Sequence, residues 1–272
     1  MSARFDVSER VIIVTGGAGL LGEQYGRALV HAGAHVILAD IDTRRVETVV
    51  ADLDGLRGSA TAATVDVADE SSVARLVAFT VQRFGRIDGL VNNAALDPKV
   101  DRGDRSRLAI AFENYPLEMW NRALAVNLTG MFLCSRAVAP AMLSQERGVI
   151  VNISSTYGLV GPDQRLYEPD APDAPREFKP VAYSVTKSGV LGFTRYLAAY
   201  WAGTGIRVNT LTPGGVLHSQ PPGFVRKYCA RTPMGRMAEP DEYCGALIFL
   251  LSDASSYMTG GNLIVDGGWT AW

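Results

Sequence analysis

The chain has 272 residues, of which 47% are hydrophobic and 20% charged, with a net charge of −2 and a pI near 6.0. This composition suits one large domain, and the near-neutral charge argues against a nucleic-acid or anionic-membrane surface. The polar residues 1–10 contain no apolar segment of secretory type, and apolar runs such as Ala246–Leu251 are too short to cross a bilayer. The three cysteines are an odd number without metal-type spacing, so we expect reduced thiols, no metal site and a cytoplasmic location.

Short apolar runs alternate with helical segments along the chain. We expect strands at Val11–Thr15, Val36–Asp40, Ala60–Val65, Leu90–Val91, Gly148–Ile153, Ile206–Leu211 and Leu263–Val265. We expect helices over 20–32, 43–54, 69–84, 116–143, 182–202 and 239–251. Nearly all-apolar strands are typical of a sheet covered on both faces. The pattern predicts the α/β class: a doubly wound parallel sheet of seven strands in a single domain, 1–272.

The first strand runs into a glycine-rich turn at residues 15–22. Gly16, Gly19 and Gly22 allow a tight turn, close approach of the backbone to a pyrophosphate, and close packing of helix on strand. Phosphates at such a turn lie at the helix N-terminus, where free N–H groups and the helix dipole favour anions. The turn therefore predicts a dinucleotide site; the alternative is a plain glycine-rich turn.

Asp40 ends the second strand, eighteen residues after Gly22. A carboxylate at this place accepts both hydroxyls of an adenosine ribose and repels a 2′-phosphate. We therefore predict NAD rather than NADP as the cofactor. The alternative is that Asp40 caps the following helix, a role for which Asp42 is better placed.

Polar residues also end the third and fourth strands. Asp66 and Val67 can hold an adenine amino group through a carboxylate and a backbone group. In the segment 92–95, the two asparagines can tie strand ends together, and the two alanines leave room for a cofactor.

Tyr183 and Lys187 stand four residues apart, so they lie one turn apart on one face of the predicted helix 182–202. A free tyrosine has a pKa near about 10 and carries protons poorly at neutral pH. A neighbouring ammonium group favours the phenolate and lowers that pKa. The pair is a candidate general acid/base; the alternative is a partly buried tyrosine beside a solvated lysine.

Taken together, these motifs resemble the short-chain dehydrogenase/reductase family over essentially the whole chain. The resemblance implies a Rossmann-type fold, with residues 1–95 as the mainly dinucleotide-binding half and 96–272 as the catalytic and substrate-binding half. The matching pieces, in chain order, are the 15–22 turn, Asp40, Asp66, Asn92–Ala95, Asn127 in Val126–Gly130, Ser154-Ser155, Tyr183 with Lys187, Pro213-Gly214, and Val265–Gly268.

The resemblance implies a four-residue mechanism. Tyr183 transfers the proton to or from the substrate oxygen, and Lys187 holds the nicotinamide-ribose hydroxyls and keeps the tyrosine acidic. Ser155 hydrogen-bonds the substrate oxygen as charge develops there, and Asn127 holds a water that links Lys187 to solvent. The residues expected to contact NAD are Gly16, Gly19, Leu20, Leu21, Gly22, Asp40, Ile41, Asp66, Val67, Asn93, Ala94, Ala95, Tyr183, Lys187, Pro213, Gly214 and Val216.

Two segments are longer than is usual in the family, about 97–115 and 161–180. Both follow strands at the end where ligands bind in this architecture, and the second is rich in proline and charge, which predicts a loop. We expect a polar, sugar-like or sugar-acid substrate held by residues of these loops, with Ser155 at its reactive oxygen. The candidates are Arg102, Arg105, Arg107, Arg165 and Tyr167; for each arginine the alternative is a solvated loop charge.

Further along the chain, His218 stands where relatives often have a threonine that contacts the nicotinamide amide, so either Ser219 substitutes for it or His218 faces the substrate. Segment 216–235 is expected to cover the pocket as a mobile lid. Trp269 and Trp272 are expected to pack across a subunit interface rather than on their own subunit. The resemblance implies a homo-oligomer, a tetramer or dimer, with the helices of 116–143 and 182–202 at one interface.

The sequence therefore predicts an NAD-dependent alcohol dehydrogenase or carbonyl reductase acting on a small polar substrate. The chain also resembles relatives that modify sugars of surface polysaccharides or flagellin glycans, through Gly16–Gly22, Ser155–Gly158 and the proline-rich segment. Alternatives are 3-oxoacyl-thioester reduction, which usually uses NADPH, and nucleotide-sugar epimerisation or dehydration, favoured by the G-x-x-G-x-x-G spacing. A catalytically inactive nucleotide sensor is disfavoured because all four mechanistic residues are present.

Overall fold

The computed structural model describes residues 3–97, 110–169 and 176–272. Its centre is one parallel sheet of seven strands in the order β3-β2-β1-β4-β5-β6-β7, which confirms the predicted class and strand number. The strands are β1 (Val11–Thr15), β2 (His35–Asp40), β3 (Ser59–Thr64), β4 (Gly89–Asn92), β5 (Gly148–Ile153), β6 (Ile206–Pro213) and β7 (Asn262–Val265).

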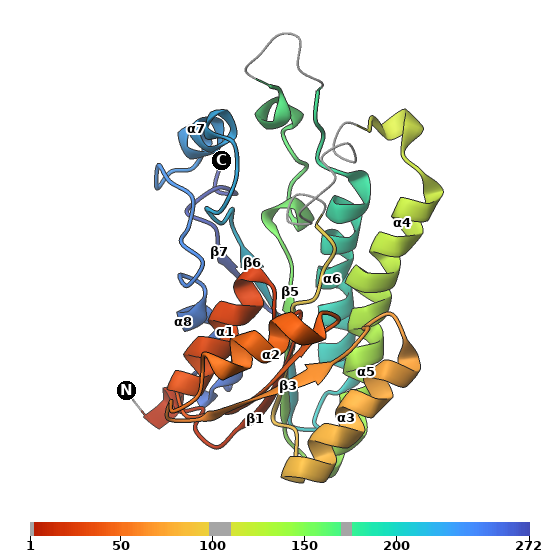
Figure 1. Ribbon diagram of the computed structural model, residues 1–272, viewed down its shortest axis with the longest axis vertical. Coiled ribbons are helices and arrows are strands. Elements are labelled where there is room, and N and C mark those ends of the chain that lie inside the picture. Colours follow the sequence, from red (N-terminus) through yellow and green to blue (C-terminus); the bar gives the residue numbers. More distant parts are fainter. Residues whose placement is uncertain (1–2, 98–109, 170–175) are drawn as a thin grey trace.

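Helices cover both faces of the sheet (Figure 1). Helices α1 (Leu20–His31), α2 (Thr43–Ala51) and α8 (Cys244–Leu251) lie on one face, and α3 (Glu70–Phe84), α4 (Leu117–Leu124), α5 (Gly130–Ser144) and α6 (Val181–Tyr200) on the other. Helix α7 (Pro222–Arg231) lies above the strand ends.

Strand β1 supplies both hydrophobic cores because successive side chains of a strand point to opposite faces. Ile12 and Val14 are buried with α1, α2 and α8, whereas Val11 and Ile13 are buried with α3, α5 and α6. All five residues of β1 are buried, as expected for the centre of a sheet covered on both sides.

Local capping sets several helix ends. The Asp42 side chain accepts a hydrogen bond from the Arg45 backbone N–H and starts α2, so the predicted capping role of Asp42 is confirmed. Asp69 caps α3 in the same way, and Gly85 ends it in the left-handed region at φ 72°.

One predicted boundary is wrong: the helix expected over 239–251 begins only at Cys244. The stretch 116–143, expected to be mostly helical, is helical and contains a π-helical turn at Ala125–Thr129. The predicted loop 161–180 contains a short 3₁₀ helix at Gln164–Tyr167. Sequence periodicity locates helical segments better than it locates their ends or single widened turns.

The C-terminus folds back onto its own chain. Trp269 is 1% exposed and its ring stacks on Tyr228, with centroids 4.1 Å apart. The predicted placement of Trp269 across a subunit interface is therefore wrong: its apolar ring is already covered within the monomer. Trp272 is 75% exposed, and its indole nitrogen donates to the Arg231 carbonyl oxygen at 3.1 Å.

The continuous helical stretch Leu117–Ser144 is long and apolar enough to span a membrane by length and composition alone. Half of its most apolar window is buried inside the protein, as it is in a core helix.

Candidate active site

A cavity of about 1600 Å³ opens at the carboxyl ends of the strands. Strands β1 and β4 are neighbours, but the chain winds outward from them in opposite directions, so a crevice forms where they separate. The volume exceeds the roughly 300–1,000 Å³ of a typical small-molecule pocket, which leaves room for a dinucleotide and a substrate together.

The glycine turn forms one wall of this cavity. Gly16 adopts φ +65°, and a Cβ there would lie 2.8 Å from the Ala94 Cα. Helix α1 begins at Leu20 with no side-chain cap from Gly19, so its first N–H groups point towards the cavity that Leu20 and Leu21 line. This arrangement fits a pyrophosphate. Gly22 does not line the cavity, but a Cβ there would lie 2.0 Å from the Gly16 carbonyl oxygen, so its role is packing.

Asp40 lies beside this turn. Its carboxylate accepts hydrogen bonds from the backbone N–H of Ala18 at 3.0 Å and of Asp42 at 3.1 Å. A carboxylate has about four acceptor sites, so this geometry leaves capacity for ribose hydroxyls. The two bonds hold Asp40 against the glycine turn, and Ile41 and Arg45 continue the same wall.

The ends of β3 and β4 complete the nucleotide side. Asp66 and Val67 line the cavity, as do Asn93, Ala94 and Ala95. Asn93 donates from its side-chain nitrogen to the carbonyl oxygens of Thr15 and Gly16, both at 3.1 Å. The amide therefore ties the end of β4 to the glycine turn of β1, as the sequence suggested.

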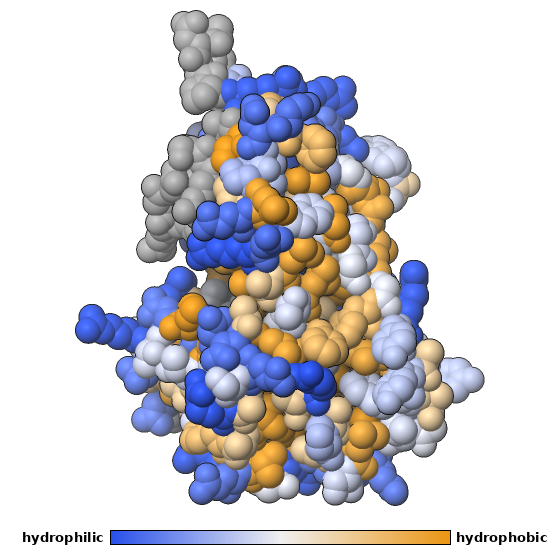
Figure 2. Space-filling view, turned by 90° about the vertical axis from the view of Figure 1, so that its right-hand side faces the viewer, coloured by the Kyte–Doolittle hydropathy of each residue, from blue (hydrophilic) through white to orange (hydrophobic). Residues whose placement is uncertain are grey.

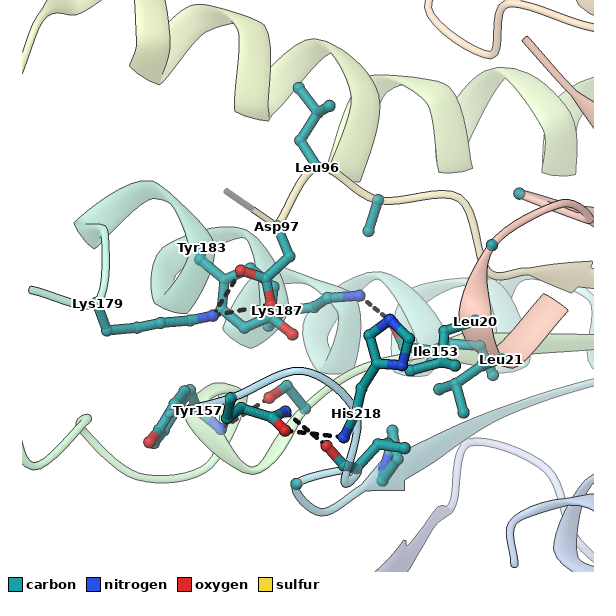
Figure 3. Close-up of a pocket in the computed structure, with 18 of the residues that line it drawn as sticks. Leu20, Leu21, Leu96, Asp97, Ile153, Tyr157, Lys179, Tyr183, Lys187 and His218 are labelled. Atoms are coloured by element: carbon teal, nitrogen blue, oxygen red, sulfur yellow. Dashed lines mark hydrogen bonds and ion pairs between the residues drawn. The ribbon is translucent and has the colours of Figure 1, made fainter. Parts of the chain in front are cut away.

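Ser155, which follows β5, lines the same cavity as Tyr183 and Lys187. Figure 3 shows Tyr183 and Lys187 side by side on α6. Ser154 donates its hydroxyl to the Lys187 carbonyl oxygen at 2.8 Å, which anchors β5 to α6. Ser155 accepts from the Tyr157 N–H at 3.2 Å. The two serines thus have different partners: the Ser154 hydroxyl is engaged by the backbone of α6, and the Ser155 side chain hydrogen-bonds Tyr183.

The expected acidification of Tyr183 by Lys187 is wrong for this structure. Tyr183 is half-buried as a whole, but its hydroxyl lies deep, and burial raises its pKa well above the ordinary value; the charge of Asp97 raises it further, and hydrogen bonding to Ser155 opposes the rise. The Lys187 ammonium donates to the Ile153 carbonyl oxygen at 2.8 Å. Burial lowers the Lys187 pKa from 10.5 to about 8.

Asn127 lies in the π-helical turn between α4 and α5 and is buried. Its side-chain oxygen accepts from the Leu96 N–H at 2.7 Å, and its nitrogen donates to the Thr186 hydroxyl at 3.1 Å. Asn127 therefore fixes the chain after β4 against α6; it does not itself line the cavity.

The structure brings some of the predicted substrate residues to the cavity. Tyr167 lines it and donates its hydroxyl to the Tyr157 oxygen at 3.1 Å, and His218 points into it (Figure 3). Arg165 is instead paired with Asp163 at 2.7 Å, with 79% of its side chain exposed, and it does not line the cavity. Arg102, Arg105 and Arg107 lie outside the described residues.

Segment 216–235 covers the cavity, as expected, but much of it is the helix α7, which was not predicted. The Tyr228 hydroxyl accepts from the Gly215 N–H at 2.7 Å, and Phe224 packs against Tyr167 with ring centroids 5.4 Å apart. Pro213, Gly214 and Val216 line the cavity at the base of this cover.

Sequence reasoning missed Lys179 and Asp97. The Lys179 ammonium contacts both carboxylate oxygens of Asp97, at 2.8 and 2.9 Å, and lies 3.7 Å from the Tyr183 ring centroid. Lys179 belongs to the inserted segment 161–180 and Asp97 to the segment 97–115. Both residues stand at the ends of the two inserted segments and next to residues of the family motifs, and this position in the sequence could have marked them as site residues.

Comparison with known proteins identifies the family. Residues 10–167 match the family model described as short chain dehydrogenase. The chain belongs to the short-chain dehydrogenase family. Residues 175–270 match a second model, described as enoyl-(acyl carrier protein) reductase.

Similar short-chain dehydrogenases cover nearly the whole chain. D-threitol dehydrogenase of Mycolicibacterium smegmatis is 37% identical, over 98% of this chain and 95% of the relative. The reductase FabG of Thermotoga maritima, named for 3-oxoacyl-[acyl-carrier-protein], is 33% identical, over 95% and 97%. A solved gluconate 5-dehydrogenase from Burkholderia cenocepacia, in complex with NADP and tartrate, superposes with a TM-score of 0.85 at 30% identity, over 99% and 98% of the two chains.

These relatives are consistent with a short-chain alcohol dehydrogenase, as predicted. They do not support the resemblance to enzymes of surface-polysaccharide or flagellin-glycan modification, because their names are those of threitol, gluconate and cyclic-alcohol enzymes and an acyl-carrier-protein reductase.

Proposed function

We propose that this short-chain dehydrogenase is an NAD-linked, cytoplasmic enzyme that interconverts a secondary alcohol and a ketone on a sugar-like substrate. The observation that carries the proposal is the convergence of Ser155, Tyr183 and Lys187 at the end of a cavity whose other end is the glycine turn. The bound nicotinamide dinucleotide supplies the hydride acceptor.

The chain's own groups account for the proton. In the oxidation direction the Ser155 hydroxyl orients the substrate oxygen, and Tyr183 accepts the proton that leaves it. Burial raises the Tyr183 pKa, so the phenol stays protonated near neutral pH and is well suited to donate during carbonyl reduction. Alcohol oxidation needs the phenolate, so it should accelerate as the pH rises, whereas carbonyl reduction should change little near neutral pH because the phenol stays protonated.

The choice of NAD rests on Asp40. Its negative charge lies on the wall expected to hold the adenosine ribose, where it would repel a 2′-phosphate. Among relatives both cofactors occur: the gluconate 5-dehydrogenase structure holds NADP, and a xylitol dehydrogenase that is 28% identical was solved with NAD⁺ at a TM-score of 0.83.

The test is oxidation of a panel of polyols, sugars and sugar acids with NAD⁺ and with NADP⁺, in wild type and in Tyr183→Phe. We expect NAD⁺-linked turnover of at least one secondary alcohol and a loss of about 10²–10⁴ in kcat for the variant. Tyr157→Phe is the matched control, because this phenol lines the same cavity but belongs to a different element. Equal losses in both variants would overturn the assignment of Tyr183.

A second candidate is 3-oxoacyl-thioester reduction, favoured by the similarity to FabG. NADPH-linked reduction of an acetoacetyl thioester that exceeds any alcohol oxidation would support it. The charged pair of Lys179 and Asp97 beside Tyr183 disfavours it, because an acyl chain packed against the pair would remove water from two charged groups.

We also propose that the enzyme is a homo-oligomer. Large apolar side chains are exposed on α4, α5 and α6 and just before α4, and Figure 2 shows apolar residues spread over this side of the molecule. They are Phe112, Leu117, Phe132, Val185, Tyr196 and Tyr200. Patches of this kind usually mark interaction sites, and light scattering of the purified protein would test the assignment.

A further inference from the structure

The Lys179–Asp97 ion pair joins the two inserted segments at the catalytic end of the cavity. Only 3% of the Lys179 side chain is exposed, against 23% of that of Asp97. Figure 3 shows Lys179 reaching across to Asp97 beside Tyr183. The pair is therefore built into the wall that a substrate bound at Tyr183 would touch.

Both partners are held in place by their surroundings. The Lys179 backbone N–H donates to the Gln164 side-chain oxygen at 2.9 Å, which ties it to the 3₁₀ helix of its own insertion. Asp97 follows Leu96, whose backbone is fixed by Asn127. Such support from neighbouring groups is what a specificity contact requires.

The geometry decides which partner faces a substrate. The Lys179 ammonium donates a hydrogen bond to each carboxylate oxygen of Asp97. It also lies over the Tyr183 ring, at a distance typical of a cation–π contact. Both residues line the cavity, and the carboxylate of Asp97 is the more exposed of the two side chains. The wall therefore offers a hydrogen-bond acceptor whose charge is balanced, not an unpaired cation.

The two ammonium groups beside Tyr183 are already engaged. Lys179 donates to Asp97, and Lys187 donates to the Ile153 carbonyl oxygen at 2.8 Å. A substrate carboxylate at Tyr183 would therefore have to compete for these cations and would lie beside the like charge of Asp97, whereas a hydroxyl group would find an acceptor there.

We infer that Asp97, positioned by Lys179, is a specificity-determining residue that accepts hydrogen bonds from hydroxyls next to the reacting carbinol, so that the substrate is a neutral polyol and not a sugar acid. This inference rests on the proposed function and narrows it. It also replaces the arginines suggested from the sequence with an acidic residue that the sequence analysis did not single out.

The test compares kcat/KM for xylitol and for xylonate, a polyol and an acid of equal carbon number, in the full-length enzyme with NAD⁺. The ratio of the two values within one sample does not depend on the fraction of active protein. Wild type should favour the polyol by at least tenfold. Asp97→Asn should move the ratio towards the acid by tenfold or more, because it removes a negative charge and leaves Lys179 unpaired.

Lys179→Met should move the ratio in the opposite direction, because it removes a positive charge next to Asp97. Asp163→Asn is the matched control: Asp163 is also paired with basic side chains, Arg165 and Arg231, but does not line the cavity, so its ratio should stay at the wild-type value. Shifts of both single variants in one direction, or shifts below threefold, would overturn the inference.

Each single variant leaves one buried charge without its partner, which destabilises a fold. The double variant Asp97→Leu with Lys179→Met removes both charges and the carboxylate acceptor, and it serves if a single variant does not fold. Its preference for 2,3-butanediol over 2-butanol should fall at least tenfold, because leucine offers no acceptor for the second hydroxyl; an unchanged preference refutes the inference. If wild type oxidises no secondary alcohol at all, the proposed function fails, and the inference with it.

Discussion

The stability of the C-terminal end should depend on one of its two tryptophans. Trp269 is 1% exposed and stacks on Tyr228, whereas Trp272 is 75% exposed. Replacing a buried tryptophan by alanine costs about 3–5 kcal/mol, which for a chain of this size lowers Tm by roughly 10 °C. Trp272→Ala removes one exposed hydrogen bond to Arg231, worth about 1 kcal/mol.

Urea unfolding followed by circular dichroism, at matched protein concentrations, measures both variants. The indole nitrogen of Trp269 has no hydrogen-bond partner among the described residues, so Trp269→Phe should cost clearly less than Trp269→Ala. Because the ring supports α7 over the cavity, Trp269→Ala should also raise the KM for the alcohol. If Trp272→Ala lowers the free energy of unfolding as much as Trp269→Ala does, or more, the reasoning is wrong, and the result would favour packing of the C-terminus at a subunit interface.

Three further predictions concern the nucleotide wall and the buried lysine. Asp40→Ala should raise kcat/KM for NADP⁺ relative to NAD⁺ at least tenfold, because Arg45 on the same wall can then meet a 2′-phosphate; an unchanged ratio in steady-state assays would contradict the role of Asp40. Gly22→Ala should unfold or strongly destabilise the protein, since its Cβ would lie 2.0 Å from a carbonyl oxygen, while Gly245→Ala, with nothing within 4 Å, should stabilise it by about 0.5 kcal/mol in thermal melts. Burial lowers the Lys187 pKa from 10.5 to about 8, so between these two pH values the unfolded protein still holds the proton that the folded protein has lost. The free energy of unfolding of the wild type, relative to that of Lys187→Met, should therefore rise by about 3 kcal/mol between pH 8 and 10.5. A difference in unfolding free energy that does not change with pH would contradict this.

The sequence by itself determined the architecture. Alternating apolar strands and periodic helices predict a parallel sheet covered on both faces, and that sheet is present with the expected number of strands. The turn made by the glycines at 16, 19 and 22, and the place of Asp40 and Asn93 beside it, could be predicted because they depend on local backbone geometry at strand ends. Such requirements act over a few residues and leave a pattern in the chain.

Tertiary structure alone decided the electrostatics of the site. The pKa of Tyr183 depends on how deeply its hydroxyl is buried: burial raises it, whereas the sequence spacing had suggested that a neighbouring ammonium group would lower it. The contact between Lys179 and Asp97 joins residues 82 positions apart, and the two side chains meet only because both insertions fold over the same strand ends. Burial and long-range pairing are properties of the packed molecule, so no local pattern in the chain encodes them.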